Sequence, residues 1–186
     1  MLVCLRDILS KPLQQPDRSF RLVKSALQGV AMNVLFICSA NMCRSPMAEG
    51  YLRATASERG LDDIRVRSAA VFHSPGYTAT EGARWTAVAN GFDLESHRST
   101  TLDDELFDWA DAILVMTHSH GREILSAFGK EAAEKTFLLG QFDPDFRSDV
   151  ERSAEIDDPY GSSHATYETV FGRIRRSIDA WLEEKS

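Results

Sequence analysis

The sequence predicts an α/β protein in which a doubly wound, four-stranded parallel sheet is flanked by helices. Short apolar runs, rich in β-branched and aromatic residues, alternate along the chain with longer segments of helical periodicity. This alternation is typical of parallel strands joined by crossover helices. The 186 residues can bury one core, and they contain no internal repeat. We therefore expect one domain over residues 32–186, preceded by a loosely ordered extension over residues 1–31.

The first strand is predicted over Val34–Ile37, four apolar residues of the kind that fill buried strands. A short loop, Cys38–Ser45, connects this strand to a helix. We expect the helix to begin with Ser45 as its N-cap and Pro46 in its first position, and to end before Gly60.

The later elements follow the same alternation. Three more strands are expected, over Ile64–Ser68, Ala112–Met116 and Phe137–Leu139. Further helices are expected over residues 80–90, 119–128 and 164–184. A long polar loop, Gly140–Ser163, precedes the last helix, and loops of this length in compact domains are commonly functional.

Composition narrows the functional classes. The formal net charge of −7 argues against a nucleic-acid partner, because such proteins carry a basic face. Three cysteines do not form a disulfide scaffold, which favours a reduced, cytoplasmic protein. No apolar run approaches the roughly 18 residues of a membrane span. Arg6 and Asp7 interrupt the N-terminal apolar stretch, so no signal peptide is predicted.

The loop after the first strand carries the chemistry. A strand that runs through a tight loop into a helix directs backbone N–H groups and the positive end of the helix dipole toward one point. Cys38 and Arg44, separated by five residues, begin and end this loop. An anion held there would meet Cys38 as nucleophile and Arg44 as a two-pronged clamp, while Ser45 donates to the sulfur. The alternative is a buried structural cysteine beside a helical arginine.

The segment Cys38–Ser45, followed by Pro46-Met47-Ala48-Glu49, resembles the phosphate loop of the low-molecular-weight protein tyrosine phosphatases. The resemblance extends from about Met32 to Trp181. Its other parts are Arg67-Ser68-Ala69-Ala70, Asp111-Ala112-Ile113-Leu114-Val115-Met116, Leu138-Leu139-Gly140 and Asp157-Asp158-Pro159-Tyr160-Gly161. It implies hydrolysis of phosphotyrosine through a cysteinyl-phosphate intermediate, with no cofactor and no metal.

The resemblance also assigns roles within the loop. The phosphate-binding positions would be Ser39, Ala40, Asn41, Met42, Cys43 and Ser45. Ala40 stands where the family usually has glycine, and we expect strain there if the position needs a positive φ. Cys43 would trap oxidised Cys38 as a disulfide, unless it is only a small buried residue beneath the loop.

The long polar loop would supply the acid. The resemblance places Asp158, immediately before Pro159, on a mobile loop as proton donor and then as base, although spacing alone does not exclude Asp157. Tyr160 would stack on the substrate ring. Gly161 replaces a second aromatic residue that many members carry, so we expect a narrower lip.

Other residues would shape and support the site. Phe72 and Tyr77 would form a wall of the substrate cleft, with ordinary loop packing as the alternative for each. Ser68 and His97 would support the phosphate loop, His97 through Asn41. His118 and His120 have no third ligand near them in the sequence, so no metal site is predicted there.

Three alternatives remain open. Protein-arginine phosphatases share the loop but carry threonine where this chain has the apolar Met42. Arsenate reductases typically have glutamine in place of Pro46 and use later cysteines, whereas no cysteine follows Cys43 here. A non-catalytic phosphate-binding module would be expected to lack the nucleophile or the acid. The implied partner is a phosphotyrosine protein, for example a tyrosine kinase that phosphorylates itself.

Overall fold

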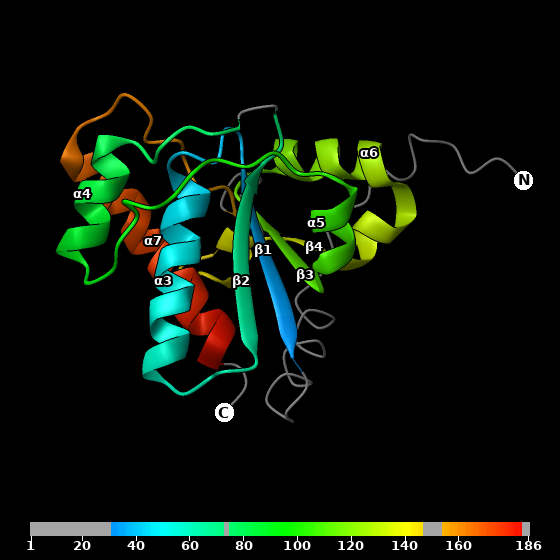
Figure 1. The fold of residues 1–186 in the computed structure, drawn as a ribbon, viewed down its shortest axis with the longest axis horizontal. Helices are drawn as coiled ribbons and strands as arrows, with labels where there is room; N and C mark the ends of the chain where they lie inside the picture. Colours follow the sequence, from blue (N-terminus) through cyan, green and yellow to red (C-terminus); the bar gives the residue numbers. More distant parts are fainter. Residues whose placement is uncertain (1–30, 73–74, 147–153, 184–186) are drawn as a thin grey trace, which may run out of the picture.

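The computed structural model describes residues 31–72, 75–146 and 154–183, and within them it contains one four-stranded parallel sheet (Figure 1). The strand order is β2-β1-β3-β4, and every neighbouring pair is parallel. The strands are β1 Met32–Cys38, β2 Ile64–Ala70, β3 Ala112–Val115 and β4 Thr136–Leu138. This confirms the predicted fold class. The predicted extension, apart from Ala31, lies outside the described residues.

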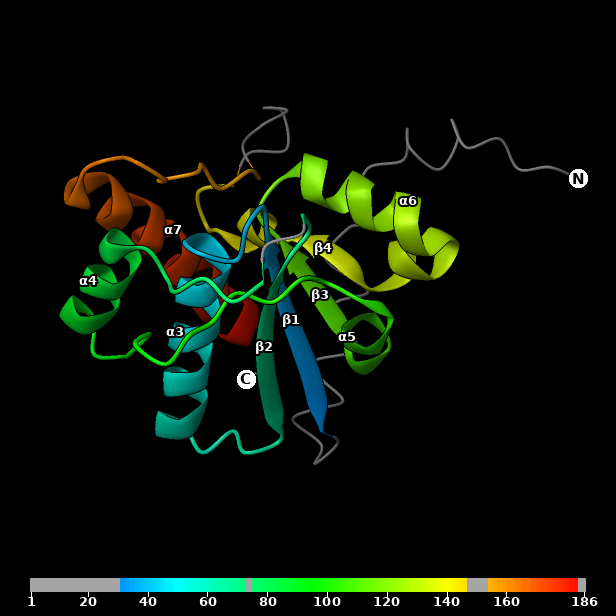
Figure 2. The ribbon, with the colours of Figure 1, turned by 45° about the horizontal axis from the view of Figure 1, so that its top comes forward.

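Helices cover both faces of the sheet (Figure 2). They are α3 Arg44–Glu58, α4 Glu81–Ala89, α5 Asp104–Trp109, α6 His118–Lys135 and α7 His164–Glu183, with a 3₁₀ turn, η1, over Leu139–Phe142. None of these helices is long and apolar enough to cross a bilayer.

Successive side chains of β1 point to opposite faces of the sheet and pack into two separate cores. Val34 and Phe36 belong to a core shared with α3, α4 and α7. Leu35 and Ile37 belong to a second core, shared with α5 and α6. All four side chains are fully buried, which is why this strand is apolar throughout and not alternating.

The α3 start differs from the prediction. The helix begins at Arg44 with Cys43 at the N-cap position, and no side chain caps it. Ser45 cannot act as the N-cap because its hydroxyl faces Cys38 and Asn41 instead. Pro46 still lies in the first turn, where its missing N–H costs nothing.

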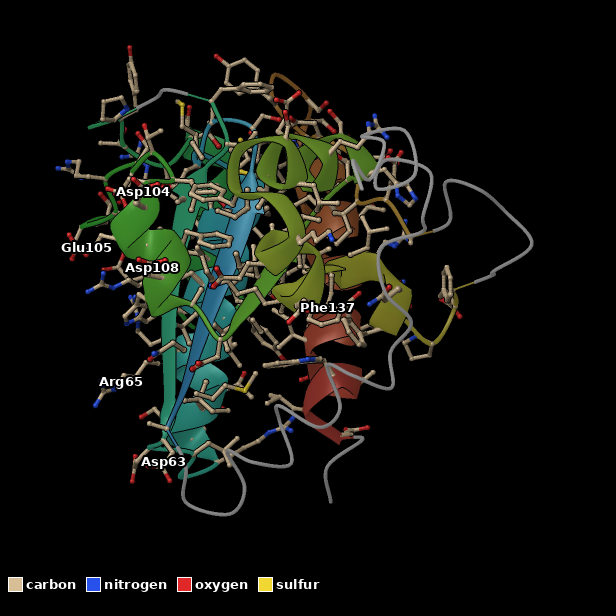
Figure 3. The ribbon with its side chains drawn as sticks, turned by 90° about the vertical axis from the view of Figure 1, so that its right-hand side faces the viewer. Asp63, Arg65, Asp104, Glu105, Asp108 and Phe137 are labelled. Carbon is tan, nitrogen blue, oxygen red and sulfur yellow. The ribbon has the colours of Figure 1, made fainter. Side chains whose placement is uncertain are left out.

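Two later helices also differ. α6 continues past Phe128 to Lys135, across a non-helical kink at Gly129 (φ 67°). α5 was not predicted, because six residues are too few for a periodic pattern; the Asp103 carboxylate accepts from Leu106 N (2.9 Å) and caps it. Figure 3 labels its exposed acidic side chains, Asp104, Glu105 and Asp108.

Candidate active site

The loop between β1 and α3 turns at Asn41. Asn41 has φ 54° and is the one non-glycine with positive φ among the described residues. Asparagine tolerates this left-handed conformation better than most residues. Ala40 does not adopt it, so the expected strain at Ala40 is wrong: the left-handed residue is its neighbour.

Asn41 is fully buried and ties the loop to its surroundings. Its side-chain amide donates to Ser45 Oγ (2.9 Å) and to Ser68 Oγ (2.8 Å), and its Oδ1 accepts from Thr100 N (2.9 Å). His97 Nε2 lies 2.8 Å from the Asn41 carbonyl oxygen. These hydrogen bonds fix the loop on the side that faces away from the pocket of Cys38. Ser68 and His97 make the contacts that a supporting role requires, and the role itself stays a prediction.

Cys38 ends β1 and lies beside the start of α3. Its Sγ is 3.0 Å from Ser45 Oγ, and the residue is 2% exposed. Because Ser45 Oγ already accepts a hydrogen bond from Asn41, its own proton is available to the sulfur. A thiolate is the form that benefits from such a donor and from a nearby helix N-terminus.

Arg44 is 3% exposed, and two of its three guanidinium nitrogens have hydrogen-bond partners among the described residues. Nη1 donates to Ile156 O (3.1 Å), while Nη2 donates to Ser39 Oγ (3.2 Å) and forms an ion pair with Asp158. Nε has no hydrogen-bond partner among the described residues. A buried charged N–H is costly to leave unpaired, so this geometry favours an anionic ligand.

These side chains line a pocket of about 310 Å³. Its lining residues are Cys38, Ser39, Ala40, Met42, Cys43, Arg44, Asp158 and Tyr160. A cavity of about 360 Å³ behind the loop is lined by residues that include Ser68 and His97, but no cysteine lines it. The pocket that Cys38 and Arg44 line is therefore the candidate active site.

Asp158 reaches this pocket, and Asp157 does not line it. The Asp158 carboxylate pairs with Arg44 through Oδ2 and accepts from Tyr160 N (3.1 Å) through Oδ1. Asp157 is exposed to solvent. Of the two carboxylates, only Asp158 is placed to meet a ligand beside Cys38.

Backbone hydrogen bonds tie the segment immediately before Asp158 to the rest of the fold, and the mobility of the loop at Asp158 itself stays a prediction. Ile156 N donates to Met116 O (2.8 Å) at the end of β3, and Arg173 donates to the Glu155 carbonyl oxygen (2.6 Å). Motion that serves the proton transfer is therefore best sought at Asp158 and beyond it.

The sequence profile of the low molecular weight phosphotyrosine protein phosphatase family matches residues 33–185. The chain belongs to this family. It is 38% identical over 136 residues to a protein-arginine-phosphatase of Bacillus subtilis, which covers 73% of this chain and 85% of that protein. It is 32% identical over 149 residues to a probable low molecular weight protein-tyrosine-phosphatase, EpsP, of Ralstonia solanacearum. This match covers 80% of this chain and 92% of that protein.

A solved structure shares the fold. It is the YwlE arginine phosphatase, in a cysteine-to-serine mutant with a phosphorylated active-site serine. It superposes with a TM-score of 0.73 at 32% identity, over 82% of this chain and 94% of that one. The family and the enzyme class, hydrolases of phosphoric monoesters, agree with the prediction from the sequence.

The aromatic residues around this phosphatase pocket are all exposed. Tyr160 is 68% exposed and lines the pocket. Phe72 and Tyr77 do not line it, although Phe72 N donates to Ser39 O (3.2 Å). Gly161 has φ 74°, which an aromatic residue would rarely adopt, so this turn favours glycine at that position.

Cys43 lines the pocket but is 4% exposed. Its Sγ is 3.3 Å from Thr80 Oγ1 and 3.4 Å from the Tyr167 hydroxyl oxygen. Burial is the main cause that raises the pKa of Cys43, and the Thr80 and Tyr167 contacts oppose it. Cys43 is therefore a protonated thiol near neutral pH, whose attack on an oxidised Cys38 would be slow until it ionises.

Peroxide treatment checks the predicted redox role of Cys43. Mild peroxide should inactivate the wild type, and dithiothreitol should restore its activity, because a disulfide protects Cys38 from irreversible oxidation. Cys43→Ser should recover far less of its own starting activity. Equal recovery of the two proteins would show that Cys43 is not a resolving thiol.

His120 was not predicted as a site residue, yet it contacts the phosphate loop. It lies in the first turn of α6, is 3% exposed, and places Nε2 2.9 Å from Ser39 Oγ. Burial, and then the Arg44 charge, lower its pKa to about 4, while Asp158 and Glu155 act in the opposite direction. A possible signal was its position just after β3, at the edge of the sheet where Cys38 also lies.

The neutral His120 should make folding pH-dependent. The folded state binds its proton less readily than the unfolded state, so stability is lost as pH falls from about 6.5 toward 4. The loss amounts to about 3 kcal/mol. Urea unfolding of wild type and His120→Phe at pH 7 and pH 4.5 measures it: the stability advantage of the wild type should shrink at the lower pH. A constant difference would contradict the prediction.

Proposed function

We propose that this protein hydrolyses phosphotyrosine in proteins, with Cys38 as nucleophile, Arg44 as phosphate clamp and Asp158 as general acid and base. The observation that carries the proposal is that Cys38, Arg44 and Asp158 line one pocket, and that the buried Nε of Arg44 has no hydrogen-bond partner among the described residues. A phosphate dianion supplies the oxygen that this N–H lacks, and it places phosphorus near the sulfur.

In the first step the thiolate of Cys38 attacks phosphorus, and the bond to the phenolic oxygen breaks. Arg44 stabilises the charge on the phosphoryl oxygens. The phosphate takes the place of the Asp158 carboxyl group at Arg44, and Asp158 enters this step in its acid form. Asp158 then gives its proton to the leaving oxygen, since a phenolate departs poorly.

In the second step water hydrolyses the cysteinyl-phosphate. Asp158 accepts a proton from the water, whose oxygen attacks phosphorus, and the sulfur leaves as a thiolate that Ser45 hydrogen-bonds. Inorganic phosphate is released. The phosphorylated serine in the structurally similar arginine phosphatase mutant supports a covalent intermediate at this position.

Phosphoarginine is the second candidate substrate. The similarity to arginine phosphatases favours it. Met42 and Tyr160 favour an aromatic substrate instead, because both line the pocket and offer apolar contact to a ring. Arsenate reduction is disfavoured because no cysteine follows Cys43 in the sequence. A non-catalytic module is disfavoured because nucleophile, clamp and acid share one pocket.

Hydrolysis of matched phosphotyrosine, phosphoarginine and phosphoserine peptides tests the proposal. We expect phosphotyrosine to give the highest kcat/KM and phosphoserine the lowest. A preference for phosphoarginine would select the second candidate. Hydrolysis of none of the three would overturn the proposed function.

Arg44→Lys should lower kcat/KM by about 10²- to 10³-fold, since an ammonium cannot donate two parallel hydrogen bonds to phosphate. The matched control is Arg53→Lys, on the exposed side of the same helix, where Arg53 is 64% exposed. Steady-state kinetics on an aryl phosphate measures both. Wild-type kinetics in Arg44→Lys would show that Arg44 is structural.

We further propose a cytoplasmic location and a phosphotyrosine protein as partner, such as a self-phosphorylating tyrosine kinase. The free thiol chemistry of Cys38, which needs a reducing compartment, supports the location. The names of the tyrosine phosphatase relatives support the partner class.

The division into residues 1–31 and a phosphatase domain over 32–186 also stays a proposal, supported by a family match that begins at residue 33.

A further inference from the structure

We propose that His120 is a positioning residue that acts through Ser39 to hold the Arg44 guanidinium in its phosphate-clamping orientation. The inference rests on the proposed function and adds a residue to it. The first turn of α6 meets the phosphate loop through a series of contacts: His120 Nε2 lies 2.9 Å from Ser39 Oγ, which lies 3.2 Å from Arg44 Nη2.

The donors and acceptors of His120, Ser39 and Arg44 determine the direction of each hydrogen bond between them. Arg44 can only donate, so Ser39 Oγ accepts from it. Nδ1 of His120 is buried and has no partner among the described residues. A buried N–H without a partner is rarer than a buried lone pair without one, which favours the tautomer protonated on Nε2. His120 then donates to Ser39, whose oxygen accepts from both neighbours.

This arrangement leaves the hydroxyl proton of Ser39 free to point into the pocket that Ser39 lines. It also fixes the Ser39 oxygen as an acceptor for Arg44. Without His120, the Ser39 side chain could rotate about its Cα–Cβ bond, and its oxygen would no longer be held toward Nη2. The Thr117 hydroxyl, which accepts from His120 N (3.4 Å), helps fix the first helical turn that presents the imidazole.

The hydrogen bond between Ser39 and Arg44 matters most while Asp158 transfers its proton. Nη2 is shared between Ser39 and Asp158. Asp158 must leave Arg44 to protonate the leaving group, and among the described residues Ser39 is then the side-chain acceptor that remains at Nη2. A neutral imidazole suits this role, because a charged one would repel Arg44. The charged groups that act on His120 are Arg44, Asp158 and Glu155.

Kinetics and anion binding of the full-length protein test the inference. His120→Phe should lower kcat/KM for an aryl phosphate by about 10- to 100-fold, the range expected when a reacting group is slightly misplaced. It should weaken inhibition by orthovanadate. His120→Gln, whose amide nitrogen can reach the place of Nε2, should recover part of both losses. His118→Phe, two residues away in the same helix, is the matched control and should resemble the wild type.

The double variant separates positioning from general damage. Ser39→Ala and His120→Phe act on one contact chain, so the double variant should lose little more than the more impaired single variant. Additive losses, equal impairment of His120→Gln and His120→Phe, or wild-type kinetics in His120→Phe would overturn the inference. Failure of the wild type to hydrolyse any phosphate monoester would instead overturn the proposed function.

Discussion

Cys38→Ser should abolish measurable turnover of an aryl phosphate while the protein stays folded. A serine hydroxyl is hardly ionised at neutral pH, and this loop is built around a thiol that is far easier to deprotonate. Loss of a catalytic nucleophile costs on the order of 10⁴- to 10⁶-fold in rate. Steady-state release of phenol and phosphate by wild type and variant at equal concentration measures the loss.

The fold should tolerate this change because the substituted atom is small and keeps its partner. Ser45 Oγ lies 3.0 Å from the sulfur and can hydrogen-bond a hydroxyl in its place. Thermal unfolding should therefore show a folded variant, and orthovanadate should still raise its melting temperature through Arg44. A folded Cys38→Ser protein with wild-type turnover would remove Cys38 from the mechanism.

The sequence predicted the parts of the fold that depend on local pattern. The run Val34–Ile37 forms part of the buried strand β1, as predicted. Cys38 and Arg44, which are close in the sequence, line one pocket. The amphipathic last helix was also found, since α7 spans His164–Glu183. Each of these signals is complete within fewer than about 20 residues.

The sequence failed where the hydrogen-bond partners of a side chain lie outside the local pattern that was used to assign it. Ser45 follows the rule for an N-cap, yet its hydroxyl contacts Cys38 and Asn41, and the N-cap position lies two residues earlier, at Cys43. The left-handed residue was sought at Ala40, because the family has glycine there. Asn41 takes that conformation, and its side chain bonds to Ser68 and Thr100 from elsewhere in the chain.

His120 could not be assigned from the sequence for the same reason. It is 81 residues from Ser39, and only the parallel arrangement of β1 and β3 brings the two together. From the sequence, His120 was considered only as a metal ligand together with His118, and that role was not predicted.

Asp158→Ala should slow hydrolysis of phosphotyrosine by about 10²- to 10⁴-fold, the usual contribution of general acid–base catalysis. The loss should depend on the leaving group. A phenol as weakly acidic as tyrosine needs a proton as it departs, whereas a strongly acidic phenol leaves without one. For the second substrate, Asp158→Ala should therefore slow formation of the cysteinyl-phosphate far less, as single-turnover release of the phenol would show.

Asp157→Ala is the matched control for this carboxylate. Asp157 is exposed and does not line the pocket, whereas Asp158 pairs with Arg44 inside it. Asp157→Ala should keep the wild-type dependence of rate on the acidity of the leaving group, and Asp158→Ala should show a steeper one. The ion pair adds a second readout: removing the Asp158 carboxylate frees Arg44 Nη2, so inorganic phosphate should inhibit Asp158→Ala at least as well as the wild type. If Asp157→Ala instead gives the steeper dependence, the neighbouring carboxylate is the acid, and the loop must rearrange when substrate binds.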